Sequence, residues 1–145
     1  MFLFWGQLLM PGAFSYNTDT SSKGSSFQSP LATFTGIRET RISPVISNST
    51  LILDCNAANV FAVSLNSNIT TLTFANVPPS GTAFGLTLLF TMDGTARTIT
   101  WGSSVKWAGG TAPTLTSTSG KVDAFVLMSH DGGVTWYAFT SGQNL

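Results

Sequence analysis

Side chains that could perform catalysis are scarce in this chain of 145 residues. It has one cysteine, Cys55, one histidine, His130, and one glutamate, Glu39. Nucleophilic catalysis needs a base beside the nucleophile, and glycoside hydrolysis needs two carboxylates across the scissile bond. Cys55 lies in an apolar run that is typical of a small buried residue, and a lone cysteine excludes a disulfide within one chain. We therefore predict that the protein is not an enzyme.

The carboxylates of the second part of the chain show no spacing that suggests acid–base chemistry or metal binding. They are Asp54, Asp93, Asp123 and Asp131. Asp93-Gly94 and Asp131-Gly132-Gly133 are combinations typical of turns, and we favour turns over calcium ligands there. His130 precedes the second turn and is expected at a strand end in solvent. No metal and no cofactor are predicted.

Aromatic side chains could bind sugar rings by stacking, but a core or subunit interface explains them better. The candidates are Trp101, Trp107, Trp136 and Tyr137. Trp136 and Tyr137 are adjacent on an expected strand, so they point to opposite faces and at least one must be covered. A receptor-binding site therefore stays unassigned.

The elements that carry these residues are expected to be short strands. Apolar runs bounded by turn residues cover 50–55, 60–65, 69–74, 84–91, 97–101, 105–107, 122–130 and 134–139. We expect 84–91 to form a hairpin with 97–101, and 122–130 to form one with 134–139. Such spacing predicts an all-β fold, an antiparallel β-sandwich or jelly-roll-like head over residues 45–145.

Residues 1–44 have no sustained strand or helix period and are predicted to form an extended N-terminal arm. A floppy terminus is the simpler alternative, but such tails are usually polar. The start of this arm carries six large apolar side chains, Phe2, Leu3, Phe4, Trp5, Leu8 and Leu9. Because these side chains would form an exposed apolar patch on a monomer, we predict that they dock on a partner.

The composition of the chain also limits the classes of partner that it could bind. Lys plus Arg and Asp plus Glu number 6 each, and 8% of the residues are charged, while 39 residues are Ser or Thr. This balance excludes a basic nucleic-acid surface, and no apolar run is long enough for membrane insertion. A chain with so little net charge tends to self-associate. Because it also contains four Trp and 11 Phe, we predict that it forms a homo-oligomer, specifically a trimer.

The order of several motifs resembles a β-module of tailed-bacteriophage virion proteins, of the kind found at the C-terminal end of predicted tail fibres. The motifs, from Asn59 to Tyr137, are 59–65, 68–74, 78–81, 97–101, 105–113, 122–125 and 131–137. The resemblance covers about 100 residues, from near Ile46 onward. It implies a non-enzymatic virion protein that assembles as a homo-oligomer, typically a trimer.

Two functions follow from this resemblance. The first is a tail-fibre-type appendage for host attachment, which would bind a cell-surface glycan or protein. The second is a capsid decoration or cement protein that bridges shell subunits. Neither a shaft of repeats nor a coiled coil is present, so the second fits the length equally well. We place the protein in the virion, on the tail rather than the capsid surface, with other virion proteins as partners; a cellular lectin-like domain is a weaker third alternative.

Overall fold

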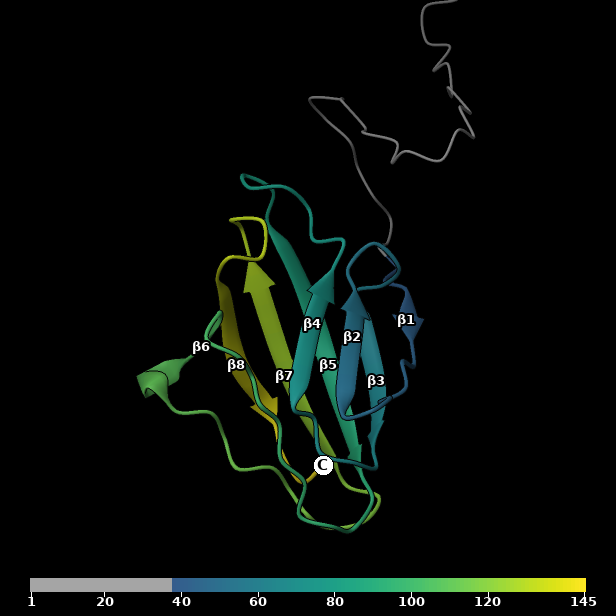
Figure 1. Ribbon diagram of the computed structural model, residues 1–145. Helices are drawn as coiled ribbons and strands as arrows, with labels where there is room; N and C mark the ends of the chain where they lie inside the picture. The colour runs from purple at the N-terminus through teal and green to yellow at the C-terminus, as the bar shows by residue number, and fades with distance from the viewer. Residues whose placement is uncertain (1–37) are drawn as a thin grey trace, which may run out of the picture. The chain divides into compact units, whose positions relative to one another are not determined.

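The computed structural model describes residues 38–145, and this part of the chain is built almost entirely of β-strands (Figure 1). The strands are β1 (Arg41–Ile42), β2 (Thr50–Asp54), β3 (Val60–Leu65), β4 (Thr71–Ala75), β5 (Phe84–Met92), β6 (Val105–Trp107), β7 (Val122–Ser129) and β8 (Trp136–Gly142). One short 3-10 helix, η1 (Ala108–Gly110), follows β6. The prediction of an all-β fold is confirmed.

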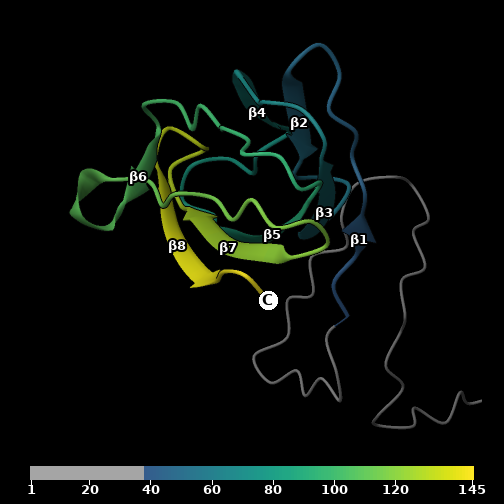
Figure 2. The same ribbon diagram turned by 90° about the horizontal axis from the view of Figure 1, so that it is seen from below.

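Two sheets face one another across a single core. The larger has the order β1-β3-β5-β7-β8-β6, and β2 pairs with β4 in the smaller. Figure 2 shows β2 and β4 lying across from the curved larger sheet. Alternate side chains of each strand point inward. The inward residues include Leu51, Leu53, Phe61, Val63, Leu88, Phe90, Phe125, Leu127 and Trp136.

The prediction of an antiparallel arrangement is wrong for most of the pairings. The pairs β1–β3, β2–β4, β3–β5 and β6–β8 are parallel, whereas β5–β7 and β7–β8 are antiparallel. For the first three of these parallel pairs, the reason is that β1 to β5 alternate between the two sheets. Neighbours within a sheet are then two strands apart in sequence, and each is reached by a crossover through the other sheet, which makes them parallel.

The predicted C-terminal hairpin is confirmed. β7 and β8 run antiparallel, with Val126 opposite Phe139. Gly132 and Gly133 have φ of 77° and 84° in the connecting turn. These left-handed conformations are why two glycines stand there.

The predicted hairpin between 84–91 and 97–101 is wrong. Both edges of β5 are already taken, by β3 and β7. Residues 97–101 form no strand and instead cross to the start of β4, where Ile99 bridges Ile69 in parallel. The Ile69 amide donates to the Thr98 carbonyl at 2.9 Å, and the Thr100 amide donates to the Ile69 carbonyl at 2.8 Å.

The described end of the predicted arm belongs to the sheet. Residues 41–42 form β1, which pairs with β3 at the register Arg41 to Val60 and Ile42 to Phe61. The six apolar arm residues, between Phe2 and Leu9, lie outside the described residues.

Candidate functional site

Among residues 38–145, Asp123 is the one carboxylate that is fully buried, and it is a structural residue. Its two oxygens accept hydrogen bonds from the Thr116 amide at 2.8 Å, the Asn144 amide at 3.0 Å and the Gln143 side-chain amide at 3.1 Å. Burial alone would raise the pKa of Asp123, but these hydrogen bonds outweigh it and hold the pKa below its usual value. The carboxylate therefore joins the segment before β7 to the C-terminal end of the chain.

Asp131 organises the β7–β8 turn. It accepts hydrogen bonds from the Thr135 amide and the Ser129 hydroxyl, both at 2.9 Å, and the Gly133 amide donates to the same hydroxyl at 3.1 Å. The Thr135 amide is the main cause of a lowered pKa at Asp131. The prediction that Asp131 is a turn residue is confirmed.

Asp54 and Asp93 hold two other turns. Asp54 accepts a hydrogen bond from the side-chain amide of Asn76 at 2.9 Å and another from the backbone amide of Asn56 at 3.0 Å. Asp93 accepts the Thr95 amide at 3.0 Å and forms an ion pair with Arg97 at 2.6 Å. Hydrogen bonds from Asn76 and Arg97, respectively, lower the pKa of the two carboxyls. The predicted turn role of Asp93 is confirmed.

Cys55 is buried and is not activated as a nucleophile. Burial, followed by the nearby Asp54, raises the pKa of its thiol to about 11, so the thiol is neutral at physiological pH. His130 lies just after β7 and is exposed, as predicted, and its ring stacks on Tyr137 with centroids 6.0 Å apart. Among residues 38–145, no three side chains of His, Cys, Asp or Glu gather in a way that could hold a metal ion.

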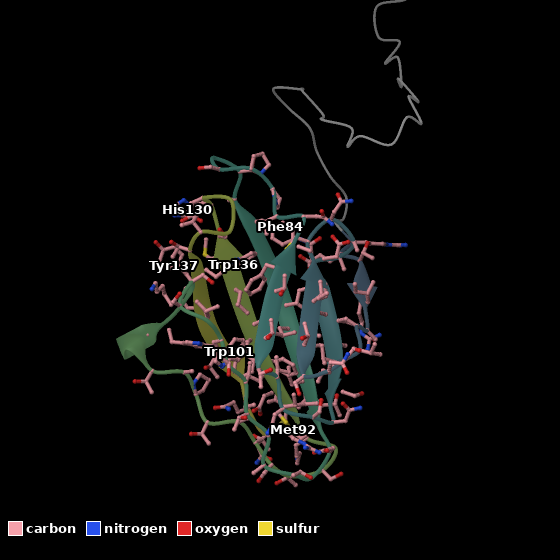
Figure 3. The ribbon with its side chains drawn as sticks, in the orientation of Figure 1. Phe84, Met92, Trp101, His130, Trp136 and Tyr137 are labelled. Carbon is pink, nitrogen blue, oxygen red and sulfur yellow. The ribbon has the colours of Figure 1, made fainter. Side chains whose placement is uncertain are left out.

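The three tryptophans of the described residues lie in the core or pack against it, and a core was one of the two positions predicted for them. Trp136 is fully buried and stacks on Phe74 with ring centroids 4.2 Å apart. Trp101 is almost fully buried and contacts Trp107 edge to face, and both rings pack against Phe125. Figure 3 shows Trp136 and Trp101 inside the fold. Core packing thus accounts for these rings without a sugar ligand.

Tyr137 points away from its buried neighbour, and it belongs to a large apolar surface that the sequence patterns did not single out. We call the side of the six-stranded sheet turned away from β2 and β4 the outer face. Its apolar patch consists of Leu89, Ala124, Val126, Met128, Tyr137 and Phe139, which have the opposite strand parity to the core residues. Phe139 is 52% exposed and Tyr137 is 41% exposed.

Cross-strand pairing makes this patch continuous. Leu89 lies opposite Ala124 across β5 and β7, and Val126 and Met128 lie opposite Phe139 and Tyr137 across β7 and β8. A signal for it was present in the run from Val122 to Met128, which is apolar at both parities except at Asp123. Strands of that composition are covered on both faces.

A hollow of about 210 Å³ lies beside β1, at the edge of the outer face that is opposite β8 and β6. Ala62, Ser64 and Thr91 line it from β3 and β5, and Pro44 and Val45 line it from the segment after β1. The three strand residues have outward parity, so the hollow opens on the same face as the apolar patch.

Comparison with known proteins adds no identification, because no family model, no curated protein and no solved structure matches the chain. No helix within residues 38–145 has the length and apolar character needed to cross a membrane.

Proposed function

We propose that this chain is a structural protein of tailed-bacteriophage virions. In this proposal it is a tail-fibre-type appendage for host attachment, a homotrimer whose N-terminal arm docks on another virion protein. The phage assignment rests on the ordered motifs between Asn59 and Tyr137 that resemble the virion β-module.

The observation that carries a structural role is the way the chain uses its polar and apolar groups. The carboxylates that could have served catalysis accept hydrogen bonds that hold turns and chain segments together. The surface that stands out is instead the apolar patch of the outer face, with Phe139 at its most exposed point. Exposed apolar surfaces mark contact sites, of which protein–protein interfaces are one class, and the proposal takes this patch for such an interface.

Quantitative mass spectrometry of purified virions that encode the chain tests the role and the place together. Tens of copies or fewer per particle support the tail appendage. About a hundred copies or more, as expected for the symmetric shell, would transfer the protein to the capsid as a decoration or cement protein. A chain absent from particles overturns the virion role altogether.

Removal of residues 1–12 tests the docking arm within the same particles. We expect the truncated protein to fold but to be lost from virions, because burial of six apolar side chains is worth roughly 1.5–3 kcal/mol each when a partner surface exists. A matched control carries the polar, Ser-rich segment 17–26 shortened by half and keeps the apolar start. If the truncated protein is incorporated at the normal copy number, the arm is not the anchor.

A further inference from the structure

We propose that the hollow beside β1 binds one ring of an acidic sugar, a monosaccharide unit that carries a carboxylate. Arg41 holds the carboxylate, and the hydroxyl and amide side chains of the hollow bond the hydroxyl groups of the ring. This inference rests on the host-attachment role in the proposed function and names the class of glycan that such a role recognises.

The hollow exists because the backbone leaves the sheet directly after β1 (Figure 1). The pairing of β1 with β3 covers only two residues, and Pro44, which has no backbone N–H to continue it, follows shortly after. Residues 43–46 then form one wall of the hollow. The outward side chains of β3 and β5 that face this wall, Ser64 and Thr91, are small and are paired in register. The surface is therefore concave at this edge of the outer face.

The charge of the hollow calls for an anion. Among the described residues that line it, Arg41 is the one with a charged side chain, and no carboxylate lies beside it there. The one ion pair within residues 38–145 joins Arg97 to Asp93, so Arg41 has no carboxylate partner in this part of the chain. A guanidinium group presents paired N–H donors that match the two oxygens of a carboxylate. A ligand with a single carboxylate therefore balances the charge of the hollow.

The other polar groups of the hollow suit the hydroxyl groups of a sugar. Ser43, Ser64 and Thr91 contribute hydroxyls, and Asn66 contributes a side-chain amide. The side-chain hydrogen bonds within residues 38–145 involve none of these four groups. Hydroxyls and amides can both donate and accept, which matches the hydroxyls of a sugar ring.

The size and the apolar wall of the hollow favour a single ring. Its volume of about 210 Å³ is below the roughly 300–1,000 Å³ of sites for drug-sized ligands, so it suits one monosaccharide unit rather than a chain of them. Pro44, Val45 and Ala62 add apolar surface on which the C–H groups of such a ring can pack.

Other anions match the hollow less well. A phosphate group carries nearly two negative charges and would meet only one cation, and a nucleotide base would find no aromatic ring among the described lining residues. A free amino acid would bring an ammonium group that no carboxylate of the hollow can pair. A carboxylate of another protein could pair with Arg41, but it has no hydroxyl groups for the remaining polar side chains. An acidic sugar uses the charge, the polar groups and the apolar wall together.

An NMR titration of the full-length, isotope-labelled chain tests this site. The probes are glucuronate and N-acetylneuraminate, two sugars that carry a carboxylate on different rings. With at least one of them, the backbone amide signals of Ser64 and Thr91 should shift and reach saturation in the millimolar range. Glucose, which has the ring of glucuronate without its carboxylate, should give no saturable shift at the same concentrations. Added salt should weaken the binding, because it screens exposed charges.

Substitutions in the hollow test the role of each group. Arg41→Gln removes the cation and should weaken binding at least about tenfold. The matched control is Lys106→Gln, because Lys106 is an exposed cation at the opposite edge of the same sheet, and its loss should leave binding unchanged. Ser64→Trp fills the hollow and should abolish binding. If that variant does not fold, Thr91→Val replaces it, because it removes one hydroxyl while keeping the shape of the side chain, and it should weaken binding several-fold.

The results separate this inference from the virion role, because the titration uses the purified chain. No saturable shift with either acidic sugar, or a shift that Arg41→Gln leaves unchanged, overturns the inference. Acetate or a glutamate-containing peptide that binds as tightly as the acidic sugars also overturns it, since the hollow would then recognise any carboxylate. A chain that binds neither sugar but is counted among the tail proteins keeps its proposed function. A chain that binds as expected but is absent from virions supports the sugar site and overturns the phage role instead.

Discussion

At the residue scale, the carboxylates show what the sequence could and could not predict. The turn roles of Asp93 and Asp131 follow from the glycines beside them, which are local signals. The burial of Asp123 could not be predicted in this way, because its partners Thr116 and Asn144 are 7 and 21 residues distant in the sequence. The local sequence around Asp123 indicates only a polar position on a strand.

Asp123→Asn should be strongly destabilising. The carboxylate accepts hydrogen bonds at both oxygens, and an amide would turn one acceptor into a donor that faces backbone N–H groups. Loss of hydrogen bonds to a buried charged group costs about 1.5–3 kcal/mol. Denaturant unfolding measures this loss, with Asp93→Asn, at an exposed turn, as the control that should lose less. Equal losses in the two variants would contradict the structural role of Asp123.

The same carboxylate predicts the acid limit of stability. Since the folded-state pKa of Asp123 is lowered, its contribution is complete above the unfolded pKa of about 3.9 and disappears as the pH falls through the folded value. The wild type should therefore lose stability below about pH 4, and Asp123→Asn should lose less over the same interval. Parallel pH profiles for the two proteins would show that another group is responsible.

At the element scale, the sequence predicted what is contiguous and missed what is distant. The β7–β8 hairpin was predictable because its strands and turn lie within one stretch, Val122 to Phe139. Pairing of β3 with β5 joins Val60 to Thr87, and the intervening β4 lies in the other sheet. Alternation of apolar residues shows which face of a strand is buried but not which strand lies beside it, so the parallel pairings were missed.

A side chain at the second glycine of the β7–β8 turn should destabilise the protein. A Cβ at position 133 would lie 3.1 Å from a Val77 methyl and 3.4 Å from Trp136 Nε1, and its φ is positive. Gly133→Ala should cost about 1–3 kcal/mol from strain and crowding together. Gly102→Ala is the matched control, since Gly102 has φ of +73° with nothing within 4 Å of the added Cβ. Thermal unfolding should rank position 133 as the more costly, and the reverse order would contradict this packing.

At the scale of the whole molecule, the described residues contain a complete core. The buried apolar side chains come from Leu51 to Ala138 and involve both sheets. β1 adds an edge to this unit rather than a part of its centre, and its contribution is a few backbone hydrogen bonds and the half-buried Ile42. The folded unit should therefore survive loss of the preceding residues but weaken when β1 is removed.

Two truncations test where the folded unit begins. A chain that starts at residue 38 should unfold cooperatively with nearly the stability of the full chain. A chain that starts at residue 45, the boundary expected from the sequence, loses the pairing of β1 with β3 and the hydrogen bonds from the Asn59 and Val60 amides to the Thr40 carbonyl, at 3.2 and 3.1 Å. At about 0.5–1.5 kcal/mol for each hydrogen bond, this should cost a few kcal/mol. Urea unfolding of both chains makes the comparison. Equal stabilities of the two truncated chains would place the boundary of the folded unit at residue 45 and show that β1 adds no measurable stability. Failure of the chain that starts at residue 38 to fold would make residues 1–37 part of the domain.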